Sequence, residues 1–228
     1  MSIKELDSLR DSFKNIYSIL RGYGFNNNPE FTQSSLTRWA YDVSEEYNNV
    51  DFDSEYTDYI YISTDTTCIT MAYGETKCVI MGDNGWVYKI PFENKNYNYC
   101  DEEAEIYEKA VEEKIEKFFA PCYFLEKIDG LNIYVMACAE VSVGDLHDDL
   151  RRRLSSEGRS DEEAEDIVIE AEDNAEFVEW LFPYYAGDVD FDKFLEFLSE
   201  ENINDLHSGN IGYIDGNVVL IDYSGYHG

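Results

Sequence analysis

The stretch from Tyr56 to Val141 most constrains the fold, because strand-like segments surround a single long helical segment there. The strand-like segments alternate apolar and polar residues and are rich in β-branched and aromatic side chains, a pattern that predicts antiparallel strands. They fall within residues 56–92 before the helical segment and within residues 122–141 after it. The predicted order is three strands, one helix and two strands.

Turn and stop signals divide this stretch further. Gly82-Asp83-Asn84-Gly85 predicts the turn of one hairpin, and Asp129-Gly130 predicts the turn of a second. The helical segment 101–121 begins with acidic residues and ends in Pro121. Both signals favour a single helix over the whole segment.

Helical periodicity dominates on both sides of the strand-like stretch. Apolar residues spaced by three and four predict amphipathic helices over residues 3–22 and 32–46. The pattern is helical again from Ser142, with a polar break at residues 157–160, until residues 211–222 predict a final hairpin. We therefore expect an α+β protein in three segments. These are an N-terminal helical extension (1–55), a strand-rich lobe (56–141) and an acidic C-terminal lobe (142–228).

Composition indicates a folded, cytoplasmic protein. Hydrophobic residues make up 44% of the chain and aromatic residues 15%, which is enough to bury a core. The five cysteines form no CxxC pair, which favours reduced thiols over disulfides or zinc ligands. The N-terminus lacks the apolar segment of a signal peptide, and no run of about 18 apolar residues follows. We expect no membrane association.

Negative charge is concentrated in one region of the chain. The net charge is −32, and residues 140–201 contain 5 basic and 21 acidic residues, so that 5 minus 21 gives −16 within 62 residues. Such a field repels nucleic acid and attracts basic proteins, so we expect a basic protein partner or substrate and no direct nucleic-acid binding. Amphipathic helices with solvated outer faces give a similar pattern. Arg151, Arg152 and Arg153 are expected to balance neighbouring acids.

Oxygen-bearing side chains gather near the C-terminus. Asp205, His207 and Asn210 form a D-x-H-x-x-N loop, and Asp222 ends the apolar strand V-V-L-I-D twelve residues after Asn210. Carboxylate and amide oxygens are the hard ligands that Mg²⁺ prefers, and a carboxylate can accept the proton of an attacking hydroxyl. A polar turn capped by Asp and Asn beside a buried strand is the alternative interpretation.

The segment from Asp205 to Gly225 resembles the catalytic and metal-binding loops of the protein-kinase-like superfamily. The D-x-H-x-x-N form is most similar to aminoglycoside phosphotransferases and small phage-encoded kinases. The resemblance covers about residues 56–226 and implies a bilobal kinase-like fold that binds ATP and Mg²⁺. It implies that Asp205 accepts the hydroxyl proton and that Asn210 and Asp222 hold the metal. His207 would shape the loop or donate to phosphate.

The resemblance also requires a strand lysine and a helix glutamate before the catalytic loop. Lys89 in W-V-Y-K-I matches the lysine and is the one cation of its strand-like segment. Glu105 is the predicted partner of this lysine, with Glu108, about one helical turn further on, as the alternative. Taken alone, these residues are an ordinary strand lysine and solvated helix acids. Their order before Asp205 and Asp222 favours the catalytic interpretation.

The predicted nucleotide-covering loop departs from the family pattern. Gly74 is the one glycine that remains, and Val79 is the valine expected to pack beneath adenine. Backbone donors from Glu75 to Lys77 and the ammonium of Lys77 are expected to compensate in part for the missing glycines. Backbone groups of Ala139 and Val141, where the last strand passes into helices, are the expected hinge against adenine.

Few residues follow the metal-binding loop, so we expect the helices that hold a peptide in protein kinases to be absent and the C-terminal lobe to be minimal. Three functions stay open. The favoured one is phosphate transfer from ATP to Ser or Thr of a host protein or of the chain itself, as for a phage protein in host cytoplasm. The second is an acidic, DNA-mimic-like inhibitor of a host DNA-binding or defence protein on a kinase-like scaffold. The third is a small-molecule phosphotransferase with a cationic substrate.

Overall fold

The computed structural model describes residues 1–26, 30–52, 59–82, 84–93 and 97–224. Within these ranges the protein has eight α-helices, a seven-stranded antiparallel sheet and a separate two-stranded hairpin, which confirms the α+β class. The chain divides into two compact units. The first comprises Met1–Ala104 and Cys122–Cys138, and the second comprises Glu105–Pro121 and Ala139–Gly228. No helix of the described ranges is long and apolar enough to cross a membrane.

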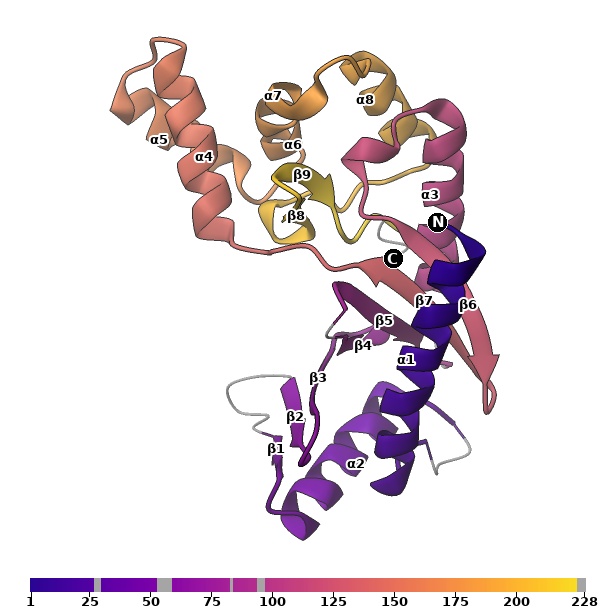
Figure 1. The fold of residues 1–228 in the computed structure, drawn as a ribbon. Helices are drawn as coiled ribbons and strands as arrows, with labels where there is room; N and C mark the ends of the chain where they lie inside the picture. Colours follow the sequence, from indigo (N-terminus) through magenta and orange to yellow (C-terminus); the bar gives the residue numbers. More distant parts are fainter. Residues whose placement is uncertain (27–29, 53–58, 83, 94–96, 225–228) are drawn as a thin grey trace. The chain divides into compact units, whose positions relative to one another are not determined.

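Two amphipathic helices open the first unit (Figure 1). Helix α1 (Ile3–Gly22) is capped by Ser2, whose hydroxyl accepts from the Glu5 N–H while the Glu5 carboxylate accepts from the Ser2 N–H. Helix α2 (Gln33–Glu46) begins in the same way, with Thr32 paired to Ser35. The apolar stripes of both helices are buried, so both predicted helices are confirmed.

The sheet of the first unit has more strands than the sequence indicated. Five strands precede the long helix where three were predicted, because residues 59–91 form four strands and a further short strand lies in the predicted N-terminal extension. The strands are β1 (Val50–Phe52), β2 (Tyr59–Ser63), β3 (Cys68–Tyr73), β4 (Lys77–Met81), β5 (Trp86–Pro91), β6 (Cys122–Ile128) and β7 (Leu131–Ala137). They are ordered β1-β2-β3-β4-β5-β7-β6, and all neighbours are antiparallel.

Both predicted turns of this sheet connect hairpins. Strands β4 and β5 pair from Lys77↔Pro91 to Met81↔Val87, and Asp83 of the connecting turn lies outside the described residues. In the β6–β7 turn, Asp129 has φ 49° and Gly130 has φ 92°. Two successive positive φ values are typical of the two-residue turns that match strand twist, and Asp-Gly adopts them at low cost.

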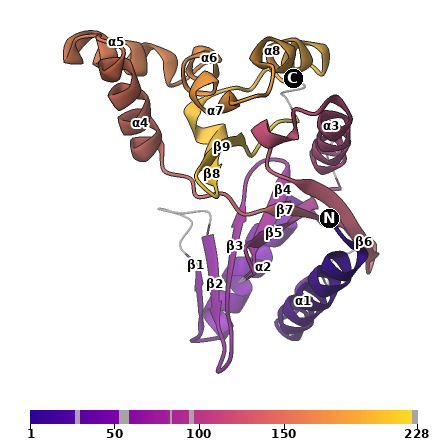
Figure 2. The same ribbon diagram turned by 45° about the horizontal axis from the view of Figure 1, so that its top comes forward.

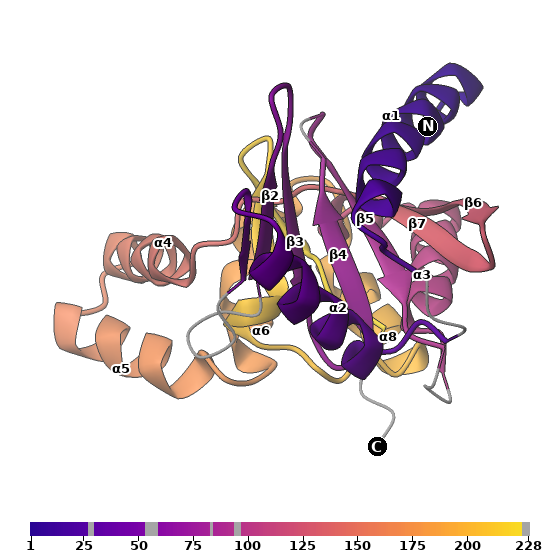
Figure 3. The ribbon, with the colours of Figure 1, turned by 90° about the horizontal axis from the view of Figure 1, so that it is seen from below.

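Alternation of side chains gives the sheet two different faces. One cross-strand row runs through Ile60, Met71, Ile80, Tyr88 and Val135, all of which are fully buried. This row belongs to one hydrophobic cluster with the apolar stripes of α1 and α2, and both helices lie along this face in Figures 1 and 3. The segment predicted as an N-terminal extension therefore shares its core with the sheet.

Helix α3 (Tyr99–Glu113) is shorter than the predicted helix over residues 101–121. Lys114 adopts the left-handed conformation with φ 62°, and the Ile115 N–H donates back to the Ala110 carbonyl at 2.9 Å. These contacts end the α-helix, and the 3₁₀ turn η1 (Glu116–Phe118) follows before Pro121. The C-terminal end of α3 therefore depends on the left-handed Lys114 and not on Pro121.

The second unit is helical apart from one hairpin (Figure 2). Its helices are α4 (Val143–Ser156), α5 (Asp161–Ala171), α6 (Glu176–Leu181), α7 (Pro183–Ala186) and α8 (Phe191–Glu200). The predicted break at residues 157–160 separates α4 from α5. The turn η2 (Ser208–Asn210) leads into the predicted C-terminal hairpin of β8 (Ile211–Ile214) and β9 (Asn217–Leu220). Buried aromatic rings from η1, the junction of α6 and α7, α8 and the segment after β9 form its core, including Phe118, Phe182, Phe194 and Tyr223.

Candidate functional site

Lys89 lies on the sheet face opposite to α1 and α2. It is directly across from Val79 of β4 and Tyr134 of β7, whereas the residues before and after it point to the other face. Its side chain is 5% exposed. The ammonium donates to both carboxylate oxygens of Glu103, at 3.0 Å from Oε1 and 2.9 Å from Oε2. A strand lysine is therefore held by a helix carboxylate.

The carboxylate that holds Lys89 is Glu103 and not the predicted Glu105. Glu103 is fully buried on α3, and its Oε1 also accepts from the ammonium of Lys77 at 2.9 Å. Glu105 and the alternative Glu108 are exposed. A helix turns by about 100° per residue, so a side chain at position 105 points about 200° away from one at position 103, to a different face of the helix. Three buried charged groups, two ammoniums and one carboxylate, thus form a cluster.

Gly74, Lys77 and Val79 lie in the β3–β4 hairpin. Its turn is tight, since the Gly74 N–H donates to the Lys77 carbonyl at 3.1 Å. A Cβ at Gly74 would meet no atom within 4 Å, so the fold itself does not require glycine there. Lys77 is buried against Glu103, and Val79 is half-buried beside Lys89. The turn uses the Gly74 N–H, which is not among the donors expected for phosphate from Glu75 to Lys77, and the Lys77 ammonium belongs to the buried cluster.

The predicted hinge residues flank a backbone bridge in the second unit. Glu140 lies between Ala139 and Val141, and its N–H and C=O both bond to Tyr213 of β8 at 2.9 Å. A Cβ at Gly212 would lie 2.8 Å from the Ala139 Cβ, so this close approach requires glycine. The segment after β7 is therefore fixed to the β8–β9 hairpin by main-chain contacts.

The D-x-H-x-x-N loop is closed by its own side chains. The Asn210 amide nitrogen donates to the Asp205 carbonyl at 2.9 Å. His207 Nδ1 accepts from the Gly209 N–H at 3.1 Å, so the neutral imidazole carries its proton on Nε2. This Nε2 lies 3.8 Å from Asp205 Oδ1, and the Asp205 side chain is 51% exposed. The structure thus brings Asp205, His207 and Asn210 together, with the Asp205 carboxylate open to solvent.

Asp222 lies at the same end of the hairpin as Asn210. The β8–β9 pairing continues beyond the strands, because the Ile221 N–H donates to the Asn210 carbonyl at 3.0 Å. Asp222 follows directly, and the buried Tyr223 after it donates its hydroxyl to the Ala120 carbonyl at 2.7 Å. Strand pairing before Asp222 and this anchor after it fix the backbone of the predicted metal ligand. Gly225, which ends the predicted segment, lies outside the described residues.

The assignment of Asn210 and Asp222 as Mg²⁺ ligands stays a prediction of the resemblance. No group of three His, Cys, Asp or Glu side chains suited to a metal ion occurs among the described residues. Mg²⁺ commonly takes only one or two protein ligands and completes its shell with phosphate oxygens and water. The Asp222 carboxylate and the amide oxygen of Asn210, whose nitrogen already donates within the loop, would be the two protein ligands of such an ion.

Sequence reasoning missed a polar network, centred on the buried Asp149, that joins the hairpin to α4 and α7. The Asp149 carboxylate accepts from Arg152 at 3.3 Å, from Arg153 at 3.1 Å and from the Tyr185 hydroxyl. The Tyr185 ring lies 6.4 Å from the Tyr213 ring of β8. Burial raises the pKa of both tyrosines, and the hydrogen bond to Asp149 raises that of Tyr185 further. The sequence did carry one signal for this network: Arg152 and Arg153 follow Asp149 by three and four residues, a spacing that brings side chains together on a helix.

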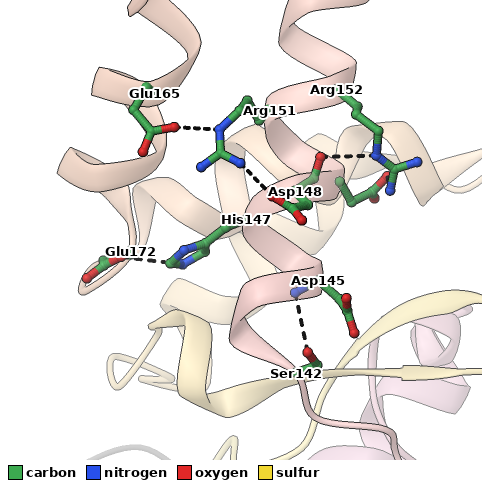
Figure 4. Close-up of polar contacts among 9 residues, drawn as sticks. Ser142, Asp145, His147, Asp148, Arg151, Arg152, Glu165 and Glu172 are labelled. Carbon is green, nitrogen blue, oxygen red and sulfur yellow. Dashed lines mark hydrogen bonds and ion pairs between the residues drawn. The ribbon is translucent and has the colours of Figure 1, made fainter. Parts of the chain in front are cut away.

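The arginines of α4 balance neighbouring acids, as expected (Figure 4). Arg151 donates to Asp148 of its own helix and to Glu165 of α5. His147 Nε2 lies 3.5 Å from Glu172, just beyond the end of α5. Polar contacts therefore connect α4 with α5 and its C-terminal end at two positions along α4.

No family model, no curated protein and no solved structure matches this chain. The resemblance to the protein-kinase-like superfamily therefore stays a prediction. Its support comes from the residues and contacts of the chain itself.

The pairing of Glu103 with two lysines predicts that neutralising Glu103 costs much more stability than neutralising Glu105 on the same helix. Glu103→Gln is expected to lower the free energy of unfolding by about 3–5 kcal/mol, because it leaves two buried ammonium groups around a neutral amide. Glu105→Gln makes the same chemical change at an exposed position and is expected to stay within about 0.5 kcal/mol of wild type. Urea unfolding followed by circular dichroism and tryptophan fluorescence measures both. Equal effects would contradict the assignment.

The tyrosine network predicts a loss of stability at alkaline pH. Tyr184 has its pKa raised to about 12, mainly by burial, and the pKa values of Tyr185 and Tyr213 are raised as well. Unfolded tyrosines ionise near pH 10 while these remain neutral in the folded state, so their contribution is complete below about pH 10 and is lost as pH rises above it. The melting temperature should fall from pH 10 to 12. Tyr213→Phe should make this fall shallower, whereas Tyr61→Phe, at an exposed ring, should leave it unchanged.

Proposed function

We propose that the protein is an ATP- and Mg²⁺-dependent phosphotransferase of the protein-kinase-like superfamily. The observation that carries the proposal is the buried ion pair between Lys89 and Glu103, found on the strand and the helix that the resemblance requires. Burying such a pair costs several kcal/mol per ion before the attraction is counted, so its presence calls for a reason. One such reason is that the ion pair holds the lysine in the position where it would contact phosphate oxygens.

The remaining candidate residues fit the other tasks of phosphoryl transfer. Asp205 would orient the acceptor hydroxyl and take its proton, since its carboxylate is open to solvent. The Nε2–H of His207 would steady that carboxylate. Asn210 and Asp222 would hold Mg²⁺, which when bound neutralises charge on the phosphate oxygens. Catalysis of this kind needs positioning and electrostatic stabilisation more than covalent chemistry.

Adenine would pack against the sheet face that carries Lys89. Val79 is the direct cross-strand neighbour of Lys89, and Met136 of β7 is the neighbour of Val87, two residues before Lys89. These apolar side chains share the face with the ammonium because each strand alternates with a period of two. Backbone groups of Ala139 and Val141 would hydrogen-bond the base edge.

The acceptor that fits best is a Ser or Thr hydroxyl on a basic protein, either a host protein or the chain itself. Helix α5 exposes five acids, namely Asp161, Glu162, Glu163, Asp166 and Glu170. Such a surface attracts basic sequences and raises their association rate, an effect that salt weakens. A phage protein that acts in the host cytoplasm accords with this proposal.

A transfer assay with labelled ATP and Mg²⁺ tests the proposal. The wild type, alone and with a basic protein such as histone, is expected to transfer label and to gain about 2.7 kcal/mol of stability at 100 times the ATP dissociation constant. Asp205→Asn should reduce transfer at least about 100-fold while ATP binding persists. Asp222→Asn should abolish the Mg²⁺-dependent part of the stabilisation.

Asp215→Asn provides the matched control for these variants. Asp215 lies in the β8–β9 turn with φ 49°, a conformation that Asn adopts readily. This change removes one carboxylate from the same hairpin and should leave transfer unchanged. Absence of both transfer and ATP-induced stabilisation in the wild type would refute the enzyme proposal.

The exposed acids of α5 also favour a second candidate, an acidic inhibitor that mimics DNA towards a host DNA-binding or defence protein. Its binding should fall steeply as salt rises from 50 to 500 mM and should be unaffected by Asp222→Asn. Glu162→Lys combined with Asp166→Lys should weaken capture of a DNA-binding protein. Asp11→Lys, at an exposed acid of α1, serves as control. Capture that is insensitive to salt would argue against this candidate.

A further inference from the structure

A patch of exposed aromatic and apolar side chains lies on the sheet face opposite to α1 and α2, towards the β1 edge. Tyr59 and Tyr61 of β2 alternate with buried residues and are each 42% exposed. Tyr61 pairs with Thr70 of β3, and Thr70 pairs with Met81 of β4, which is 45% exposed. Cross-strand partners point to the same side of a sheet, so these four side chains form one surface. We call it the β2–β4 patch.

The side chains of the β2–β4 patch are of the types that bind proteins. The rings of Tyr59 and Tyr61 are stacked side by side, with centroids 6.1 Å apart and an angle of 19° between their planes. Tyrosine and methionine are enriched in protein–protein interfaces, and methionine adapts its shape to a partner. The face of an aromatic ring also attracts cations, arginine more often than lysine. The patch therefore suits a cationic partner.

The charge around the patch favours a basic partner as well. Residues 50–82 contain six acids and one lysine, Lys77, which is buried against Glu103 and adds little positive charge at the surface. Asp51 of β1 is exposed and lies directly across from Tyr61. A guanidinium group can stack on a ring and pair with a carboxylate at the same time. Asp51 and Tyr61 thus offer both contacts to one arginine.

The same charge disfavours the other occupants of such a surface. The chain has a net charge of −32, so a second copy would bring like charge against the patch. A nucleic acid strand, which could stack its bases on the tyrosines, would bring phosphates. Both would be repelled, whereas a basic segment is attracted.

We propose that the β2–β4 patch docks an arginine-containing segment of a basic protein, with a guanidinium group over the rings of Tyr59 and Tyr61 and paired with Asp51. This docking requires neither ATP nor Mg²⁺, so it goes beyond the proposed function and can be tested apart from it. It also differs from the attraction exerted by the acids of α5, because a contact with defined side chains distinguishes arginine from lysine.

Fluorescence anisotropy with two labelled peptides, an Arg-Gly repeat and a Lys-Gly repeat of equal length and charge, tests the proposal. The wild type is expected to bind the Arg-Gly peptide more tightly. Tyr59→Ala combined with Tyr61→Ala should weaken binding of this peptide about tenfold without changing the net charge, because cation–π contacts with two rings are lost. Tyr41→Ala is the matched control, since its ring is 46% exposed on α2 at the other face of the sheet.

The carboxylate of the proposed site has a control of its own. Asp51→Asn should weaken binding of the Arg-Gly peptide and reduce the dependence of that binding on salt, because one ion pair is removed. Asp11→Asn makes the same change in charge at an exposed position of α1 and should have a smaller effect.

The thiol of Cys68 reports where the peptide binds. Cys68 is exposed and points to the same side of β3 as Thr70, two residues further on. A saturating concentration of the Arg-Gly peptide should therefore slow the alkylation of Cys68 by a maleimide, measured by mass spectrometry. The same concentration should give less protection in the variant that lacks both tyrosines.

Several results would overturn the proposal. Equal affinity of the wild type and the double tyrosine variant for the Arg-Gly peptide is one, and equal binding of the two peptides by the wild type is another. A dimer in sedimentation experiments that the double variant loses would assign the patch to self-association instead. Binding of an oligothymidine that depends on the two tyrosines would assign it to nucleic acid. All these measurements are made without ATP, so they stand whether or not the chain transfers phosphate.

Discussion

The ion cluster of Lys77, Lys89 and Glu103 is the constraint on which the charged interior of the first unit depends. The two ammoniums come from adjacent strands and the carboxylate comes from a helix, so their contacts fix the rotation of α3 against β4 and β5. Each buried ion loses several kcal/mol of hydration, and short contacts offset this loss only while all three groups are present. The cluster therefore tolerates little movement, which is what a site that positions phosphate oxygens requires.

The sequence could have identified Glu103, since the helix carries the signal. Buried positions of α3 recur at Cys100, Glu103, Tyr107 and Ala110, spaced by three and four. A charge within such an apolar stripe is predicted to be buried and paired, whereas Glu105 lies outside the stripe. The choice of Glu105 followed the family order, and the helical period was applied only to Glu108 and not to the apolar stripe of the helix. Lys89 is the one cation of its strand-like segment, and the structure pairs it with a carboxylate of α3.

Other features depended on tertiary contacts that no local pattern reveals. Helices α1 and α2 were predicted from their own periodicity, but only packing shows that their apolar stripes complete the core of the sheet. The end of α3 depends on a left-handed Lys114, a conformation that its residue type does not signal. Asp149 is one acid among many until Tyr185 and two arginines surround it. The Asp-Gly turns, by contrast, were predicted because residue type alone accounts for their positive φ values.

The two units hold their candidate site residues by opposite means. In the first unit, charge is buried, and position is maintained by ionic contacts that would be costly to break. In the second unit, the backbone of the Asp205–Asn210 loop is fixed by Asn210 and by strand pairing, while the Asp205 carboxylate stays exposed. An exposed carboxylate is accessible to a reacting group, whereas buried charges interact with little screening by solvent. The proposed phosphoryl transfer would use both kinds of group.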